Sequence, residues 1–347
     1  MNRLHNLDYL RGIAAFSIMI YHYLSWSYGN FSSEHFMGRV GIYGVSVFYI
    51  LSGLTLSHVY AEKLNLSSEG ISIFFKKRIF RIFPLLWLAS IAAIILKQKS
   101  PELIDVFLTL TGLFGFFTWD TYYATGAWSI GNELVFYVFF PFFIYILRRG
   151  TPLIFALIIL FFCLHTYFAY VILDENNSLS SQWRDYVNPL NQIFLFLGGM
   201  CIKSIFDKLD LKNIYAFILI VIALLGFVCY PVSGDTIHLI TDVNRLFFTG
   251  ICFTLCIGFY KLTYTAPVWL HKPLAILGES SYSLYLLHAI VFSVISFILN
   301  RLDINNNFFD RYLEIRIALS VIVSLFVSFL SYNYFEKYFM RLASRKG

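Results

Sequence analysis

The chain has 347 residues, of which 59% are hydrophobic and only 13% charged, and its formal net charge is +6. A soluble domain of this length contains far less apolar residue, so the composition excludes an ordinary soluble enzyme. The basic residues lie in short loops between hydrophobic runs instead of forming one patch, which argues against a nucleic-acid-binding protein. We expect an all-α polytopic membrane protein, with a single domain over residues 1–347 and no fused soluble domain.

Ten hydrophobic segments are predicted to be transmembrane helices. In chain order they cover residues 9–28, 40–60, 82–96, 132–147, 152–173, 190–206, 214–231, 244–261, 282–299 and 313–335. A further apolar stretch, 103–119, is short and rich in glycine and threonine. We predict that it is a re-entrant segment, with an eleventh span as the alternative.

The charges in the loops predict the orientation. With ten spans and a cytoplasmic N-terminus, the inner loops and the C-terminal tail hold most of the lysines and arginines, as the positive-inside rule requires. If 103–119 crossed the membrane, Arg148, Arg149 and the basic tail with Arg345 and Lys346 would all face outward. Both termini are therefore predicted to be cytoplasmic.

The first span carries two residues that are costly in a bilayer, Arg11 and His22. They are eleven positions apart, which at about 100° per residue places them on one helix face, roughly 16 Å apart along the axis. Each ionisable group in a spanning helix costs about 2.5–3.5 kcal/mol. The pair predicts a polar cavity or partners inside the bundle, the alternatives being a snorkelling Arg11 and a purely structural His22.

Arg78 and Arg81 lie three residues apart in the stretch 71–84, which is predicted to be an interfacial helix leading into the third span. The guanidinium group presents a planar fork of donors that suits phosphate. The alternative is that both residues only contact anionic lipid and help to set the topology.

The fourth span begins with a polar stripe. Ser129, Glu133 and Tyr137 recur at intervals of four and follow Trp128, so the three share one helix face. A carboxylate entering a span usually has a partner or a function. The alternative is an ordinary helix start, with Ser129 as cap and Glu133 near the positive end of the helix dipole.

A second polar stripe opens the penultimate span, where Ser281, Tyr285 and His288 follow the spacing i, i+4, i+7. The alternative is that these side chains hydrogen-bond to neighbouring helices. The sequence contains no nucleotide-binding loop, zinc motif or nucleophile elbow.

Together these stretches resemble the acyltransferase-3 family, membrane O-acyltransferases that acetylate bacterial surface glycans. The resemblance covers nearly the whole chain and rests on six motifs in order. Their residues are Asp8, Arg11 and His22; Ser52 and Gly53; Arg78, Arg81 and Pro84; Trp128, Ser129, Glu133, Phe136 and Tyr137; Ser281, Tyr282, Tyr285 and His288; and Tyr332 and Glu336. Two positions depart from the family pattern: Ser46 stands where an aspartate is frequent, and Lys337 where a proline is frequent.

The resemblance implies an integral protein of the bacterial inner membrane that moves an acetyl group from cytoplasmic acetyl-CoA to a sugar hydroxyl of a glycan or lipid-linked saccharide. Acetyl-CoA is then a co-substrate, with no permanently bound cofactor and no metal. The alternatives are a longer acyl donor such as succinyl-CoA, and a glycan or lipid transporter whose polar helix faces line a path.

The residues receive roles on this basis. We expect His22 to take the proton of the sugar hydroxyl, since histidine has the matching acidity, with a covalent acetyl-histidine as the less favoured route. The remaining catalytic candidates are Arg11, Asp8 and Glu133. Arg78, Arg81 and Arg11 are expected to bind the donor. The expected substrate contacts are Trp128, Ser129, Tyr137, Tyr285 and His288.

Overall fold

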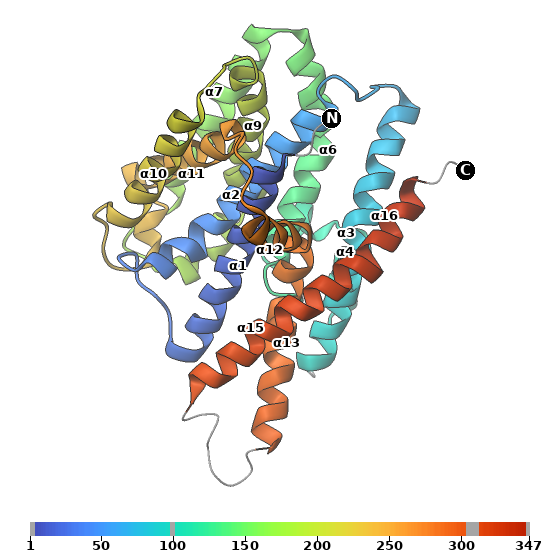
Figure 1. Ribbon diagram of the computed structural model, residues 1–347, viewed down its shortest axis with the longest axis vertical. Helices are drawn as coiled ribbons and strands as arrows, with labels where there is room; N and C mark the ends of the chain where they lie inside the picture. The colour runs from blue at the N-terminus through green and yellow to red at the C-terminus, as the bar shows by residue number, and fades with distance from the viewer. Residues whose placement is uncertain (1–3, 98–100, 303–311, 345–347) are drawn as a thin grey trace.

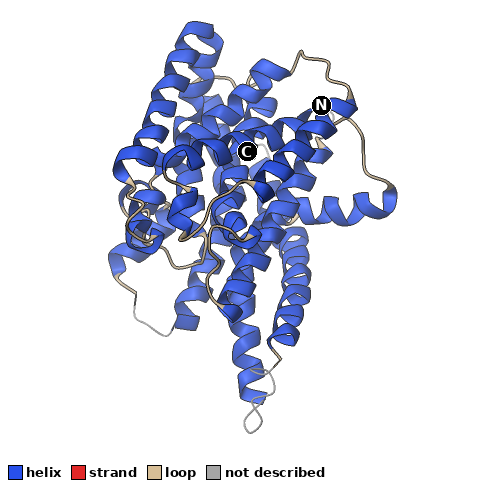
Figure 2. Cartoon of the chain, turned by 90° about the vertical axis from the view of Figure 1, so that its left-hand side faces the viewer, coloured by secondary structure: helices blue, strands red, loops and turns tan. Residues whose placement is uncertain are grey.

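The computed structural model describes residues 4–97, 101–302 and 312–344, and every regular element in these ranges is a helix. The helices form one elongated bundle (Figure 1), and the view from the side shows them joined by loops of different lengths (Figure 2). The all-helical fold predicted from the composition is confirmed.

The long helices coincide with the ten predicted spans. They are α1 (His5–Tyr28), α2 (Phe36–Tyr60), α3 (Ser68–Lys97), α6 (Ala127–Arg149), α7 (Thr151–Tyr167) with η1 (Phe168–Ile172), α9 (Pro189–Phe206), α10 (Asn213–Cys229), α11 (Asp242–Lys261), α13 (Ser281–Leu302), and α15 (Leu313–Leu330) with η4 (Ser331–Glu336) and α16 (Lys337–Ser344). The shorter elements are α4 (Leu103–Thr111), α5 (Phe114–Phe117), η2 (Leu179–Gln182), α8 (Trp183–Tyr186), η3 (Thr236–Leu239) and α12 (Val268–Glu279).

Eight helical segments in the described ranges are long and apolar enough to cross a membrane. The two long helices outside this set are α10, which has 17 residues, and α1, which carries Asp8, Arg11 and His22. The protein is therefore an integral membrane protein with several spanning helices, and the count of ten stays a prediction.

The predicted division between an interfacial helix and the third span is wrong. The stretch 71–84 belongs to α3, a single helix of 30 residues that contains Pro84. Proline lacks the N–H that would bond to the carbonyl one turn earlier. The helix nevertheless continues, because the residues directly before and after Pro84 are buried by packing: Ile82, Phe83, Leu85 and Leu86. Arg78 and Arg81 thus extend from the same rigid helix as the membrane-crossing part.

The segment 103–119 forms two short helices, α4 and α5, of nine and four residues. A helix of nine residues is about 14 Å long, well short of the roughly 30 Å of a bilayer core. In Figure 1, α3 descends and α6 ascends on either side of this segment. The helices of this segment are therefore too short for an eleventh span, and the re-entrant placement stays a prediction.

Close backbone contacts at glycines hold the helices around the site. A Cβ on Gly53 of α2 would overlap the carbonyl oxygen of Phe196 on α9, and one on Gly12 of α1 would lie 2.6 Å from the backbone nitrogen of Gly278 on α12. Small residues of this kind let membrane helices approach closely. They hold α2 against α9 and α1 against α12, and α1, α2 and α12 all line one polar interior.

Candidate active site

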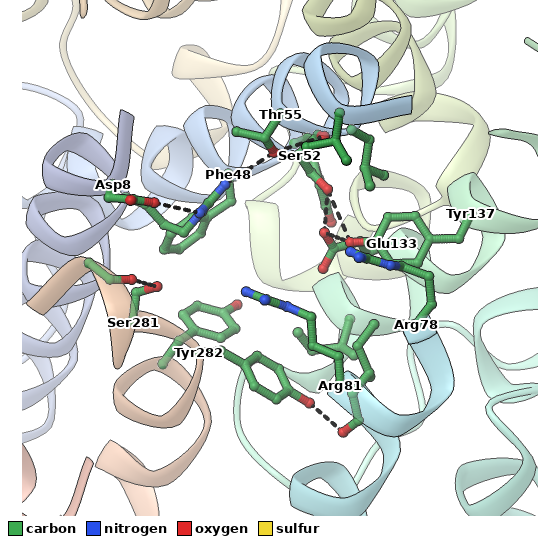
Figure 3. Close-up of a pocket in the computed structure, with 18 of the residues that line it drawn as sticks. Asp8, Phe48, Ser52, Thr55, Arg78, Arg81, Glu133, Tyr137, Ser281 and Tyr282 are labelled. Atoms are coloured by element: carbon green, nitrogen blue, oxygen red, sulfur yellow. Dashed lines mark hydrogen bonds and ion pairs between the residues drawn. The ribbon is translucent and has the colours of Figure 1, made fainter. Parts of the chain in front are cut away.

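A cavity of about 470 Å³ lies among α1, α2, α3, α6, α12 and α13 (Figure 3), within the size range of small-molecule sites. Leu4 and Tyr60 line it, so it occupies the half of the bundle in which α1 begins and α2 ends. Eight of the residues predicted for the site line this cavity: Asp8, Arg11, Arg78, Arg81, Ser129, Glu133, Tyr137 and Tyr285.

Arg11 lies on the α1 wall, where neighbouring groups hold its guanidinium group. Nη1 lies 3.4 Å from Oδ1 of Asp8, one helix turn earlier, and Nη2 donates a hydrogen bond of 3.2 Å to Oγ1 of Thr55 on α2. Arg11 therefore does not extend to the bundle surface, as snorkelling would require. It forms part of the cavity wall.

Arg78 and Arg81 form the α3 wall, and neither lies within ion-pair distance of a carboxylate in the described residues. The guanidinium group of Arg78 lies 5.9 Å from the ring centres of Tyr60 and Tyr137, and its buried Nε has no hydrogen-bond partner. Arg81 points into the cavity in Figure 3, and its Nη1 lies 3.9 Å from the sulfur of Met340. Arg81 interacts with the negative charges of Glu336 and Glu133, but neither arginine forms a direct ion pair within the described part of the chain, so both keep N–H donors available on this side.

Glu133 faces the cavity from α6 and is held by hydroxyl groups. It accepts hydrogen bonds from Ser52 on α2 and from Tyr137 one turn further on α6, and the hydroxyl oxygens of Ser52 and Tyr137 are 3.2 Å apart. These contacts explain the polar stripe on α6 better than a helix cap does, since they reach across to another helix. The carboxylate remains available to the cavity interior.

Tyr285 and Phe48 close the end of the cavity that faces α13. The hydroxyl of Tyr285 lies 2.8 Å from Oγ of Ser129, and both hydroxyls also bond the carbonyl oxygen of Gly126, at 3.1 and 2.9 Å. The ring of Phe48 packs edge-on against Tyr285 at 5.5 Å. Gly126 has φ 81°, and a Cβ there would lie 2.8 Å from the Tyr285 hydroxyl, so only glycine suits this position.

His22 and His288 lie outside the cavity lining and form a pair. Nδ1 of His22 is 2.8 Å from Nε2 of His288, and Trp26 stacks on His22 with ring centres 5.0 Å apart. The ring of Tyr285 lies 6.3 Å from that of His288, so one tyrosine separates the cavity from the two histidines. His288, expected from the sequence as a substrate contact, is a partner of His22.

Trp128 also lies outside the lining. It is buried in an aromatic cluster, with ring centres 5.5 Å from Trp183, 5.9 Å from Tyr186 and 6.4 Å from Tyr49. Its position gives it a packing role behind the α6 stripe. A residue expected to contact substrate therefore supports the wall from behind.

The site roles assigned from the sequence left out several residues that line the cavity, although Ser52 and Tyr282 belong to the motifs of the resemblance. Ser52 and Thr55 hold Glu133 and Arg11, and Tyr282 lines the floor while its hydroxyl donates to the carbonyl oxygen of Ile82. Ser52 and Thr55 are three apart within an otherwise apolar run, and this spacing is the signal that could have identified them.

The comparisons with known proteins identify the family of the chain. A family model described as an acyltransferase domain, acyltransferase-3, matches residues 4–333. The chain belongs to the acyltransferase-3 family, and it is an integral membrane member of it. No solved structure matches the chain.

Two relatives give the range of similarity. The O-acetyltransferase OatA of Staphylococcus aureus (strain NCTC 8325 / PS 47) is 26% identical over 320 residues, covering 82% of this chain and 50% of the relative. Protein 2 in the picA locus of Rhizobium radiobacter is 33% identical over 155 residues, covering 37% of this chain and 76% of the relative. The chain thus spans about half the length of the staphylococcal relatives it matches.

Proposed function

We propose that the protein is a membrane O-acetyltransferase that moves an acetyl group from acetyl-CoA to a sugar hydroxyl of an exported or cell-surface glycan. The observation that carries the proposal is the cavity, in which Arg78 and Arg81 offer guanidinium groups without ion-pair partners in the described residues. The family membership and the name of the staphylococcal relative support acyl transfer to oxygen.

The cavity suits an anionic donor with a long uncharged arm. CoA carries its phosphates at one end and its thioester at the other. The two unpaired arginines on α3 would hold phosphate through charge-assisted hydrogen bonds, which are stronger than neutral ones. From there the arm would pass Arg11 and the hydroxyls of Ser52 and Tyr282 toward Tyr285.

The reaction needs a base because a sugar hydroxyl is a poor nucleophile. His22 takes the hydroxyl proton as the sugar oxygen forms a bond to the thioester carbonyl carbon. The carbon–sulfur bond then breaks, and the proton passes to the sulfur, giving the acetylated sugar and free CoA. A positioned base of this kind contributes about 10²–10⁴-fold to the rate.

The donor arm and His22 meet only if Tyr285 moves. The cavity ends at Tyr285 and Phe48, and His22 lies behind them on α1. We propose that the arriving arm displaces the Tyr285 hydroxyl from Ser129 and the Gly126 carbonyl. The thioester then reaches the histidine pair, while the acceptor approaches His22 from the opposite side.

Acceptor-dependent release of CoA by the purified protein tests the function. Proteoliposomes are incubated with acetyl-CoA or succinyl-CoA and with a mixture of bacterial polysaccharides and lipid-linked saccharides. The mass of the modified saccharide is then measured by mass spectrometry. We expect an added acetyl group, and we expect loss of transfer in His22→Ala. The control is His238→Ala, a histidine on η3 beside Glu175 and away from the cavity.

Three outcomes contradict the proposal. Transport of a saccharide without CoA release would identify a transporter. If the group added to the product is heavier than acetyl, the protein is still an acyltransferase, but its donor is not acetyl-CoA. More than a few per cent of wild-type transfer in His22→Ala would remove His22 as the base.

A further inference from the structure

Both ring nitrogens of His288 are engaged. His288 is fully buried on α13, and its Nδ1 lies 3.2 Å from the carbonyl oxygen of Leu284 and 2.8 Å from that of Tyr285. Its Nε2 lies 2.8 Å from Nδ1 of His22. These three contacts determine where the protons of the pair reside.

A carbonyl oxygen only accepts hydrogen bonds, so Nδ1 of His288 must carry a proton. No carboxylate pairs with His288 in the described residues, and a buried, unpaired imidazolium would be costly. His288 is therefore neutral, and a neutral imidazole has one N–H, which leaves a lone pair on Nε2. Nδ1 of His22 has to donate to that lone pair, and the remaining nitrogen of His22, Nε2, is then unprotonated.

We propose that His288 is a positioning residue that fixes the tautomer of His22 and leaves Nε2 of His22 as the proton acceptor. The inference rests on the proposed function, in which His22 is the base. Nε2 of His22 has no hydrogen-bond partner in the part of the chain that the structure describes, and the atom remains reachable because His22 is only partly buried.

Neighbouring aromatic residues hold the pair in this geometry. The rings of His22 and Trp26 are parallel to within 3°, which restricts rotation of the imidazole. The hydroxyl of Tyr23 donates a bond of 2.9 Å to the carbonyl oxygen of His288 and lies 2.6 Å from Oγ of Ser324. Thus α1, α13 and α15 are joined at the level of the histidines.

The arrangement also serves the step after proton uptake. When Nε2 of His22 takes the hydroxyl proton, the ring becomes an imidazolium, and Nδ1–H still donates to Nε2 of His288. That bond is then charge-assisted and stronger. The proton on Nε2 leaves for the sulfur of CoA, which returns His22 to its starting tautomer.

The competing interpretation is that the two histidines only link α1 to α13, as polar pairs do between membrane helices. Both interpretations predict some loss of stability when His288 is replaced. They differ in whether an acceptor at the position of Nε2 restores turnover, and in which nitrogen of His22 carries the proton.

Two variants of His288 separate the interpretations by kinetics. His288→Leu removes the acceptor, and we expect kcat to fall by about 10²–10⁴-fold, with the KM of acetyl-CoA changed less than about threefold. His288→Gln can place its amide oxygen near the Nε2 position, and we expect it to recover kcat to within roughly tenfold of wild type. A Leu variant that keeps wild-type kcat overturns the inference.

The second readout does not depend on activity. Nitrogen NMR of ¹⁵N-histidine-labelled protein in liposomes distinguishes protonated from unprotonated ring nitrogens, and the His22 signals are those missing from His22→Gln. We expect the proton on Nδ1 in wild type and a changed distribution in His288→Leu. A proton on Nε2 in wild type, or an unchanged tautomer in His288→Leu, overturns the inference. If His22→Ala keeps its transfer activity, His22 is not the base, and the tautomer is judged by NMR alone.

Discussion

At the residue scale, the three arginines of the cavity differ in which groups contact their guanidinium groups. Arg11 has Asp8 beside it and Thr55 as a hydrogen-bond partner, whereas Arg78 and Arg81 contact aromatic rings and a sulfur atom. Glu336 lies near enough to Arg81 to act on it electrostatically, but a buried charge without a directly hydrogen-bonded counter-ion is costly. The two arginines of α3 are therefore the ones that gain most from an anionic ligand.

Replacing Arg81 by lysine tests this directly. Lysine keeps the charge but cannot offer two parallel hydrogen bonds to a phosphate. We expect Arg81→Lys to raise the KM for acetyl-CoA by roughly tenfold or more, about 1.4 kcal/mol of lost binding, with little change in the acceptor KM. Titration of acetyl-CoA against the purified variants measures both.

The matched control is Arg149→Lys, the same substitution at the end of α6, where Arg149 stacks on Tyr145 away from the cavity. It should leave both KM values unchanged. An unaltered donor KM in Arg81→Lys would mean that Arg81 contributes only to topology and lipid contact.

At the scale of elements, α2 and α9 pack more closely than side chains would allow. A Cβ on Gly199 of α9 would overlap the carbonyl oxygen of Ile50 on α2, and the reciprocal contact is that of Gly53 with Phe196. Because the colliding atoms belong to the backbone, they cannot rotate away. This interface sets the position of α2, which carries Ser52 and Thr55 into the cavity.

Gly199→Ala should therefore destabilise the protein by about 1–3 kcal/mol, the usual cost of overpacking. The control is Gly250→Ala on α11, where a Cβ would meet nothing within 4 Å; alanine there should be neutral or stabilise by up to about 1 kcal/mol. Thermal unfolding of the two variants in the same detergent measures the difference. Equal unfolding midpoints for the two variants would show that α2 and α9 can move apart without loss of stability.

At the scale of the whole molecule, α1 begins and α16 ends on the same side of the bundle, in the upper half of Figure 1. The cavity lies in that half, since Leu4 near the start of α1 and Tyr60 at the end of α2 line it. Arg148 and Arg149 end α6 on the same side. The donor arginines and the basic loops thus share one side of the protein.

We predict that this side faces the cytoplasm, because the basic loops follow the positive-inside rule. A reporter fused to the C-terminus, beyond Arg345 and Lys346, which lie outside the described residues, should be active only in the cytoplasm. A second reporter, of a kind that is active only outside the cytoplasm, should be active in the loop at 29–35. The reverse pattern would contradict both the orientation and the access of acetyl-CoA to the cavity.

The sequence by itself determined the helices, the polar stripes and the family. Apolar length and a period of 3.6 residues are local properties, which is why the ten predicted spans coincide with helices and why Arg11, Glu133 and Tyr285 could be selected in advance. The stretch 71–84, predicted as an interfacial helix leading into the third span, is continuous with that span in α3, where residues on both sides of Pro84 are buried.

Only the tertiary structure decided which polar faces meet. His22 and His288 are 266 positions apart, and no local pattern indicates that one binds the other instead of the substrate. In the same way, Trp128 turned out to pack against Trp183, and Ser52 to hold Glu133. Such pairings depend on how closely helices distant in sequence approach, and that is fixed by backbone contacts at glycines such as Gly12 and Gly278, whose partners the sequence does not name.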